Sequence, residues 1–191
     1  TKAPYYGQPM KLMLWQKAMI EAVYSFKMKS VDSDDWVDRF QEILLLICRK
    51  NGKSEIIAAI QFAEMIIGGS GIDIVCSGTN DGTADLAYQA IDTMRLLVDP
   101  KSVDTWRNQK GIKCLVNNNH IYKLSDSSRQ KEGRNIDVAG IDEVWSLQDD
   151  GIYKPIQQST STKGTSTPVI LRTPSTAPRS LFERLSAITT S

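Results

Sequence analysis

The sequence predicts an α+β fold that is predominantly helical, with an N-terminal core of four to five helices. Three observations lead to this fold class. Apolar residues recur at steps of three and four through 9–108, which is the spacing of helix faces. Short apolar stretches follow in 111–153, as is typical of small, irregular β elements. From residue 159 onward Ser, Thr and Pro dominate, which predicts an extended C-terminal arm.

Two helices are predicted in the first fifty residues. The first spans 10–29 and follows Pro9, which suits the first turn of a helix because proline has no N–H to leave unpaired. The second spans 34–50, because the acidic stretch 32–35 supplies an N-cap and complements the helix dipole.

Residues 35–40, Asp-Trp-Val-Asp-Arg-Phe, followed by Leu44, resemble a helical run in the C-terminal domain of retroviral capsid proteins. The resemblance covers about six of the 191 residues, and the Gln-Gly and Glu that precede the run in that family are missing. It assigns no role to any residue.

Two more helices are predicted before Pro100, which ends the last of them. The first begins with Ser54 as its cap and is apolar nearly all round, so we expect it to be the most buried helix. The other begins with Thr83 as its cap and runs to Val98. Between the two helices, 72–76 could form a short strand or continue the loop.

A hairpin is predicted from 112–116 and 120–124, because the three asparagines between them tolerate the positive φ of a tight turn. The polar stretch 125–135 is expected to be an exposed loop. Further short strands are predicted at 136–138, 143–145 and 152–153.

The composition divides the chain into a globular domain, 1–158, and an arm, 159–191. Within the domain, 9–108 is predicted to be helical and 109–158 to mix β elements with loops. The arm carries a net charge of +3 and the domain −2, and a short amphipathic helix is predicted at 181–188. A segment with so few apolar residues cannot fold alone, so we expect the arm to be held by its own domain or by a neighbouring copy.

The sequence indicates no catalytic residue, no cofactor site and no metal site. The only histidine is His120, and the three cysteines stand too far apart for a zinc site. This cysteine usage favours a reducing compartment, so the predicted location is intracellular, in cytoplasm or nucleus, with the virion as a further possibility. No membrane span is expected, because the longest apolar run, 43–48, is too short to cross a bilayer.

Two sets of residues are candidates for contacts with partners. The first set is apolar and lies at helical spacing at the two ends of the chain: Trp15, Met19, Leu181, Phe182, Leu185 and Ile188. The second set is basic: Arg129, Lys131, Arg134, Arg172 and Arg179.

The favoured function is a non-enzymatic protein that self-assembles, such as a viral capsid, nucleocapsid or matrix subunit, with its arm making contacts between subunits. The expected partners are further copies of the chain and, through the weakly basic tail, nucleic acid. The alternative is an enzyme or ligand-binding domain whose phosphate-type site lies in the Gly-rich loop 68–85. That loop lacks the standard phosphate-binding patterns, and its simpler interpretation is a turn followed by an N-cap.

Overall fold

The computed structural model describes residues 7–31, 33–40, 42–47, 51–78, 80–109, 111–125, 136–142, 156 and 169–173. Its helices are α1 (Leu14–Ser25), α2 (Lys53–Ile67) and α3 (Asp81–Val98). Its strands are β1 (Lys27–Lys29), β2 (Trp36–Asp38), β3 (Glu42–Leu46), β4 (Asp73–Gly78), β5 (Thr105–Arg107), β6 (Ile112–Cys114), β7 (His120–Ser125), β8 (Val138–Asp142) and β9 (Val169–Thr173).

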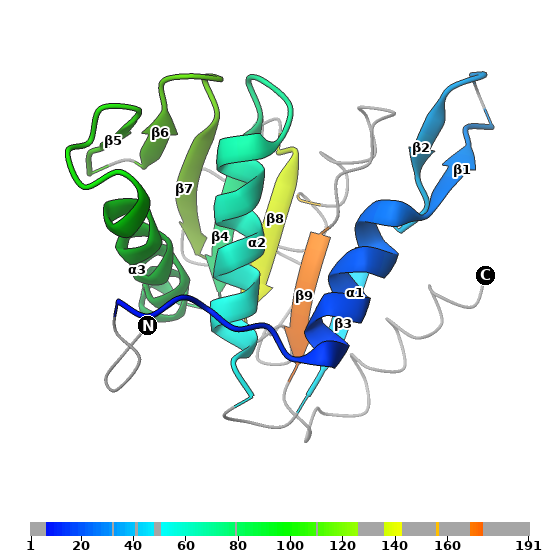
Figure 1. Ribbon diagram of the computed structural model, residues 1–191, viewed down its shortest axis with the longest axis horizontal. Coiled ribbons are helices and arrows are strands. Elements are labelled where there is room, and N and C mark those ends of the chain that lie inside the picture. The colour runs from blue at the N-terminus through cyan, green and yellow to red at the C-terminus, as the bar shows by residue number, and fades with distance from the viewer. Residues whose placement is uncertain are drawn as a thin grey trace.

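The centre of the molecule is a seven-stranded sheet with the order β3-β9-β8-β4-β7-β6-β5. The five strands from β3 to β7 in this order run parallel to their neighbours, and β6 and β5 continue the sheet antiparallel. Figure 1 shows α1, α2 and α3 on one side of this sheet, and the β1-β2 hairpin projecting away from it. Within the described residues, no helix is long and apolar enough to cross a membrane.

This architecture is an α/β, Rossmann-like fold, so the prediction of a predominantly helical α+β fold with a four-to-five-helix core is wrong. The physical reason lies in the parallel strands. They are covered on both faces, so they appear in the sequence as continuous apolar runs without alternation. Such runs cannot be distinguished from buried helix by periodicity alone.

The predicted helix 34–50 is the clearest error. Its residues form β2 and β3 where the structure describes them, and the run that resembles a retroviral capsid helix lies largely in the β1-β2 hairpin. The acidic residues cap no helix here. Instead, Asp34 and Asp38 form ion pairs with Lys29 and Lys27 across the hairpin.

The other predicted helices are present with changed ends. Helix α1 covers only 14–25 of the predicted 10–29, because β1 begins at Lys27. Helix α2 is confirmed, but its N-cap is Gly52 and not Ser54. Helix α3 is confirmed to Val98, and its N-cap is Asn80. There the Asn80 Oδ1 atom accepts a hydrogen bond of 2.9 Å from the backbone N–H of Thr83.

The hairpin predicted around Asn117–Asn119 is confirmed as β6 and β7, with Ile112 opposite Ile121. The ambiguous segment 72–76 contributes to strand β4, and the stretch 136–138 leads into β8. Part of the predicted arm is strand β9, which pairs with β3 on one side and β8 on the other. The predicted elements at 143–145, 152–153 and 181–188 lie outside the described residues. Of the predicted loop 125–135, only Ser125 is described, and it belongs to β7.

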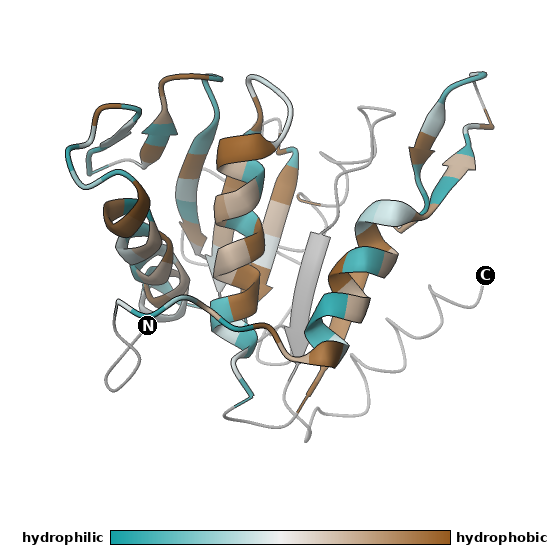
Figure 2. Ribbon diagram, in the orientation of Figure 1, coloured by the Kyte–Doolittle hydropathy of each residue, from teal (hydrophilic) through white to brown (hydrophobic). Residues whose placement is uncertain are grey.

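Two apolar clusters cover the two faces of the sheet. Helices α2 and α3 pack on one face, where Met65 and Ile91 meet Ile74 and Ile121. On the other face Val75, Ile141 and Ile156 pack together. In Figure 2 brown, apolar residues continue along much of α2, as the sequence predicted for the most buried helix.

The C-terminal end of α2 is closed by two asparagines from the β6-β7 turn. The buried Asn119 side chain donates a hydrogen bond to the Met65 carbonyl (3.1 Å) and accepts one from the N–H of Ile72 (3.0 Å). The Asn117 side chain donates to the same Met65 carbonyl (3.0 Å). These bonds satisfy carbonyls that a helix end leaves unpaired, and they fix α2 against the sheet.

Candidate functional site

The carboxyl ends of β3, β8 and β4 lie at one edge of the sheet, where α2 and α3 begin. In open α/β sheets, ligands bind in the crevice at this edge. Three stretches of chain meet here: the loop from β3 to α2, the end of β8, and the end of β4. The last two are direct neighbours, because Gly78 pairs in register with Asp142.

Helix α2 begins at a glycine with a left-handed backbone. Gly52 has φ 68°, a conformation that side chains with a Cβ atom rarely adopt. It opens the triplet Gly52-Lys53-Ser54, which is the end of the P-loop pattern G-x-x-x-x-G-K-[ST]. Ile47 stands where that pattern has its first glycine. The strand-loop-helix context, from β3 to α2, is the one that the pattern requires.

The Lys53 side chain lies across the base of this loop. It is only 5% exposed, and its ammonium group donates a hydrogen bond to the backbone carbonyl of Ile47. The ammonium group therefore lies between the end of β3 and the start of α2. The N-terminal end of a helix favours an anion because of the helix dipole.

Ser54 joins α2 to the end of β8. Its hydroxyl donates a hydrogen bond of 3.1 Å to the Oδ2 atom of Asp142, whose residue is 3% exposed. A hydroxyl beside a buried carboxylate, next to a phosphate-binding loop, is the oxygen set that holds Mg²⁺ in P-loop nucleotide hydrolases. Among the described residues, no cluster of three or more acidic, His or Cys side chains offers another metal site.

The first turn of α1 lies against the start of α2. Gln16 is 5% exposed, and its Oε1 atom accepts a 2.8 Å hydrogen bond from the N–H of Met13. Its amide nitrogen would lie 3.9 Å from a Cβ atom added to Gly52. A buried amide is thus placed beside the glycine that begins the loop's helix.

The family model described as "Terminase large subunit, ATPase domain" matches residues 14–186. The chain belongs to this terminase family. No curated protein matches the sequence significantly.

Solved structures of terminases share the fold. The crystal structure of the HK97 bacteriophage large terminase has a TM-score of 0.75 and 22% identity, over 96% of this chain and 38% of that one. A mutant of the Thermus phage P74-26 large terminase ATPase domain has a TM-score of 0.62 and 15% identity, over 89% and 67%. The ATPase domain of the same phage has a TM-score of 0.56 and 16% identity, over 82% of this chain and 68% of that one. This chain thus spans well under half the length of the HK97 protein.

Membership of the terminase ATPase family contradicts the prediction of a non-enzymatic capsid, nucleocapsid or matrix subunit. A viral origin agrees with the family, whereas the structural role does not. The comparisons support the alternative, an enzyme with a phosphate-type site. The favoured interpretation failed because it relied on the absence of catalytic and phosphate-binding motifs. The triplet at 52–54, which precedes an apolar helix, is a partial phosphate-binding motif that it did not include.

Two glycines of loop 68–85 in this terminase domain, Gly68 and Gly78, are closely packed. A Cβ atom on Gly78 would stand 2.8 Å from the Cβ atom of Thr83, so the glycine lets β4 end close against α3. At the start of α3, the Asn80 side chain already occupies the N–H of Thr83. Gly68 is the C-cap of α2. The stretch 68–85 nevertheless passes beside the site, since Gly78 pairs with Asp142.

The apolar partner candidates fall in different places. Trp15 is 37% exposed on α1, whereas Met19 packs against the cluster of Leu45, Ile56 and Ile60. The remaining candidates lie outside the described residues: Leu181, Phe182, Leu185 and Ile188.

Of the basic candidates, only Arg172 falls within the described chain. It lies in β9, opposite Leu45 of β3. The structure does not describe Arg129, Lys131, Arg134 or Arg179.

Proposed function

We propose that this domain binds and hydrolyses ATP with Mg²⁺, as the ATPase domain of a phage large terminase that packages DNA. The observation that carries the proposal is the hydrogen bond from Ser54 to Asp142, beside a helix that begins Gly52-Lys53-Ser54. The family match over 14–186 supports it.

The phosphates of ATP would bind at the N-terminus of α2. There the backbone N–H groups of the first turn have no partner within the helix, and the dipole adds a partial positive charge. Gly52 lets the backbone turn sharply into the helix, and Lys53 supplies a full positive charge for the terminal phosphates. Binding requires the Lys53 ammonium to exchange its bond to the Ile47 carbonyl for phosphate oxygens.

Mg²⁺ fits between Ser54 and Asp142. This ion prefers oxygen ligands, and proteins usually hold it through one or two carboxylates together with phosphate oxygens. The Ser54 hydroxyl and the Asp142 carboxylate are already within 3.1 Å of each other. When bound, the ion neutralises charge that develops on the phosphates.

The water that attacks the terminal phosphate needs a residue to orient it and accept its proton. Glu143 follows Asp142 directly in the sequence and lies outside the described residues. We assign it this task because it directly follows the proposed metal ligand in the sequence.

The expected partners become those of a packaging motor, namely DNA and further copies of the chain. Both stay proposals for this domain, and the basic residues named from the sequence are candidates for the DNA contact. An intracellular location follows from the same proposal. The family gives no support to a place in the virion.

The deciding experiment measures ATP hydrolysis by the wild-type chain and by Lys53→Ala. We expect Mg²⁺-dependent hydrolysis that falls at least about a hundredfold in the variant, since a charge that stabilises the transition state is removed. The matched control is Lys17→Ala on the exposed surface of α1, which should keep full activity. Nucleotide binding by calorimetry provides a second measurement. If the wild type neither binds nor hydrolyses ATP, or if both variants behave alike, the proposal is wrong.

A further inference from the structure

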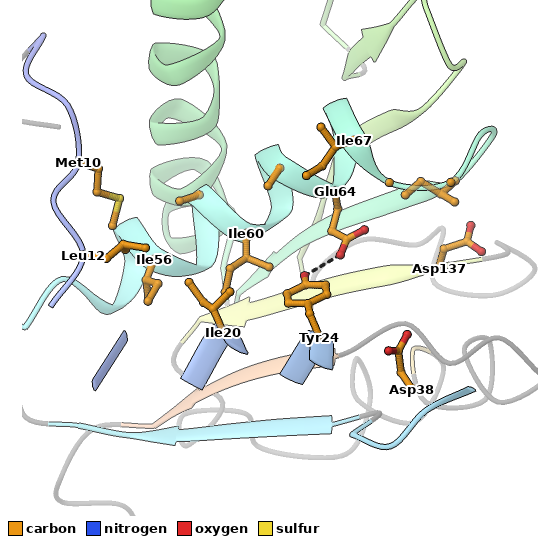
Figure 3. A pocket seen from close by; sticks show the side chains of 15 residues that line it. Met10, Leu12, Ile20, Tyr24, Asp38, Ile56, Ile60, Glu64, Ile67 and Asp137 are labelled. Atoms are coloured by element: carbon orange, nitrogen blue, oxygen red, sulfur yellow. Dashed lines mark hydrogen bonds between the residues drawn. The ribbon is translucent and has the colours of Figure 1, made fainter. Parts of the chain in front are cut away.

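A groove of about 880 Å³ runs along the outer side of α2, bordered by α1 and by the segment before α1. Figure 3 shows it from nearby, with Tyr24 and Ile20 of α1 facing α2. The groove is separate from the nucleotide loop, because it follows α2 from Ile56 to the turn at Gly68 and Gly69.

The side of α2 that faces the groove is a continuous stripe. Its members recur at steps of three and four, so they lie on one face of the helix: Ile56, Ala59, Ile60, Ala63, Glu64 and Ile67. From first to last the stripe is about 17 Å long at 1.5 Å per residue. Ala59 and Ala63 lie in its middle, where their small side chains allow the backbone of another element to approach closely.

The groove is apolar at one end and acidic at the other. Figure 3 shows Met10, Leu12 and Ile56 toward one end, and the carboxylates of Glu64, Asp38 and Asp137 toward the other. No Lys, Arg or His is among its lining residues in the described chain.

The acidic end has a defined geometry. The hydroxyl of Tyr24 donates a hydrogen bond of 2.6 Å to Oε1 of Glu64. Burial and the neighbouring carboxylates raise the pKa of Tyr24 well above its usual range, so the phenol stays protonated. Lys27 pairs with Asp38, and Asp137 accepts the N–H of Asp73. Among the described residues that line the groove, three are acidic and none is basic, so a positively charged group is favoured at this end.

We propose that this groove docks an amphipathic helix of a partner protein, with aliphatic residues at helical spacing on one face and Lys or Arg at the end that meets Glu64. A helix fits because the groove is elongated and its walls are aliphatic faces of α1 and α2. In the middle of the groove, the small side chains of Ala59 and Ala63 leave room for the helix. Charge complementarity sets the direction in which the helix lies. The proposal is independent of ATP hydrolysis, because Ala63 and Glu64, which carry it, lie about three turns along α2 from Lys53.

The probe is a fluorescein-labelled helical peptide of about 15 residues, with Leu at every third or fourth position and Arg at one end. A companion peptide has Glu in place of Arg. We expect the Arg peptide to bind the wild-type chain at least about tenfold more tightly than the Glu peptide, as measured by fluorescence anisotropy.

Two variants test the location. Ala63→Phe fills the middle of the groove at an exposed position, and should weaken binding of the Arg peptide at least about tenfold. Its control is Ala18→Phe, on the exposed side of α1 away from Ile20. Glu64→Gln should reduce the difference in affinity between the Arg peptide and the Glu peptide. Its control, Glu21→Gln at an exposed position of α1, should leave this difference unchanged.

The proposal is overturned if the Arg peptide does not bind the wild type, or if it binds Ala63→Phe as tightly. It is also overturned if tetrabutylammonium binds in the groove while neither peptide does, because that result identifies a site for small organic cations. ATP binding by each variant is measured in parallel. Loss of peptide binding with ATP binding retained separates this site from the nucleotide site.

Discussion

The Ser54 hydroxyl donates a hydrogen bond to the Asp142 carboxylate over 3.1 Å, although 88 residues separate them in sequence. The contact exists because α2 begins and β8 ends at the same edge of the sheet. It brings together the hydroxyl and the carboxylate that a nucleotide-bound Mg²⁺ requires.

Asp142→Asn keeps the shape of this contact and removes its charge. We expect the Mg²⁺ concentration for half-maximal ATP hydrolysis to rise at least about tenfold, because the amide is a poorer ligand for the ion. A titration of the hydrolysis rate with MgCl₂ measures the change. Asp85→Asn, on an exposed carboxylate paired with Lys123, is the control and should leave the titration unchanged. An unaltered Mg²⁺ requirement in Asp142→Asn would rule out this residue as a ligand.

Gly140→Ala tests the packing of α2 on the strand that carries Asp142. A Cβ atom at this position would stand 2.6 Å from Cγ2 of Ile57 and 2.8 Å from Cδ of Gln61. We expect the free energy of unfolding to fall by about 1–3 kcal/mol, since the helix must move away from β8. ATP hydrolysis should fall as well, because Ser54 moves with the helix.

Urea denaturation of Gly140→Ala measures the loss of stability. In the control, Gly69→Ala, the nearest atom to the added Cβ is 3.9 Å away, so its stability should change by less than about 0.5 kcal/mol. Equal stability of the two variants would show that α2 can adjust without cost.

Asn119→Ala removes the side chain that closes α2 at its C-terminal end. The carbonyl of Met65 and the N–H of Ile72 then lose a partner in a buried region. We expect a loss of about 2–3 kcal/mol in the free energy of unfolding, measured by urea denaturation. Gln89→Ala changes an exposed amide on α3 and should cost less than about 0.5 kcal/mol. A similarly small effect in Asn119→Ala would mean that Asn117 alone suffices as the cap.

Asp99 makes the free energy of unfolding depend on pH in the acidic range. The N–H of Val103 is the main cause that lowers its pKa, and the hydroxyl and N–H of Thr105 and the N–H of Asp104 add to it. The unfolded chain therefore takes up the proton at a higher pH than the folded one. The stabilisation from Asp99 is present above its unfolded pKa, near 3.8, and is lost as the pH falls through the lower, folded value.

We expect Asp99→Asn to flatten the fall in melting temperature between about pH 4 and pH 2. Thermal denaturation followed by circular dichroism at each pH measures this slope. Asp104→Asn, a neighbouring exposed carboxylate, is the comparison and should retain a slope close to that of the wild type. If Asp99→Asn retains the full slope, the bonds to Asp99 are not the source of the acid sensitivity.

Helices α2 and α3 could be predicted from sequence because their signals are local. Apolar residues at helical spacing identify each, and Asn80 and Pro100 stand near the ends of α3. Strands β3 and β9 could not be predicted in this way. Their identity depends on neighbours far along the chain, since β9 pairs with residues 42–46 on one side and 139–141 on the other.

In the candidate site, too, one part has a local signal in the sequence and another part depends on residues far along the chain. The triplet Gly52-Lys53-Ser54 is a local signal, and it was missed because Ile47 replaces the first glycine of the pattern. Asp142 has no such signal, since one aspartate after an apolar run is common in any sequence. Only the pairing of β8 and β4, and the position of α2 beside them, gives this carboxylate its place next to Ser54.

Among the strands that the structure describes, β9 is the last to be made during synthesis, and it lies inside the sheet. Because β9 separates β3 from β8, a nascent chain that ends before residue 169 has a gap between β3, which leads to Gly52, and β8, which ends at Asp142. The proposed nucleotide binding should therefore arise only after β9 has left the ribosome. The proposed ATP hydrolysis is therefore not expected from a chain that lacks β9.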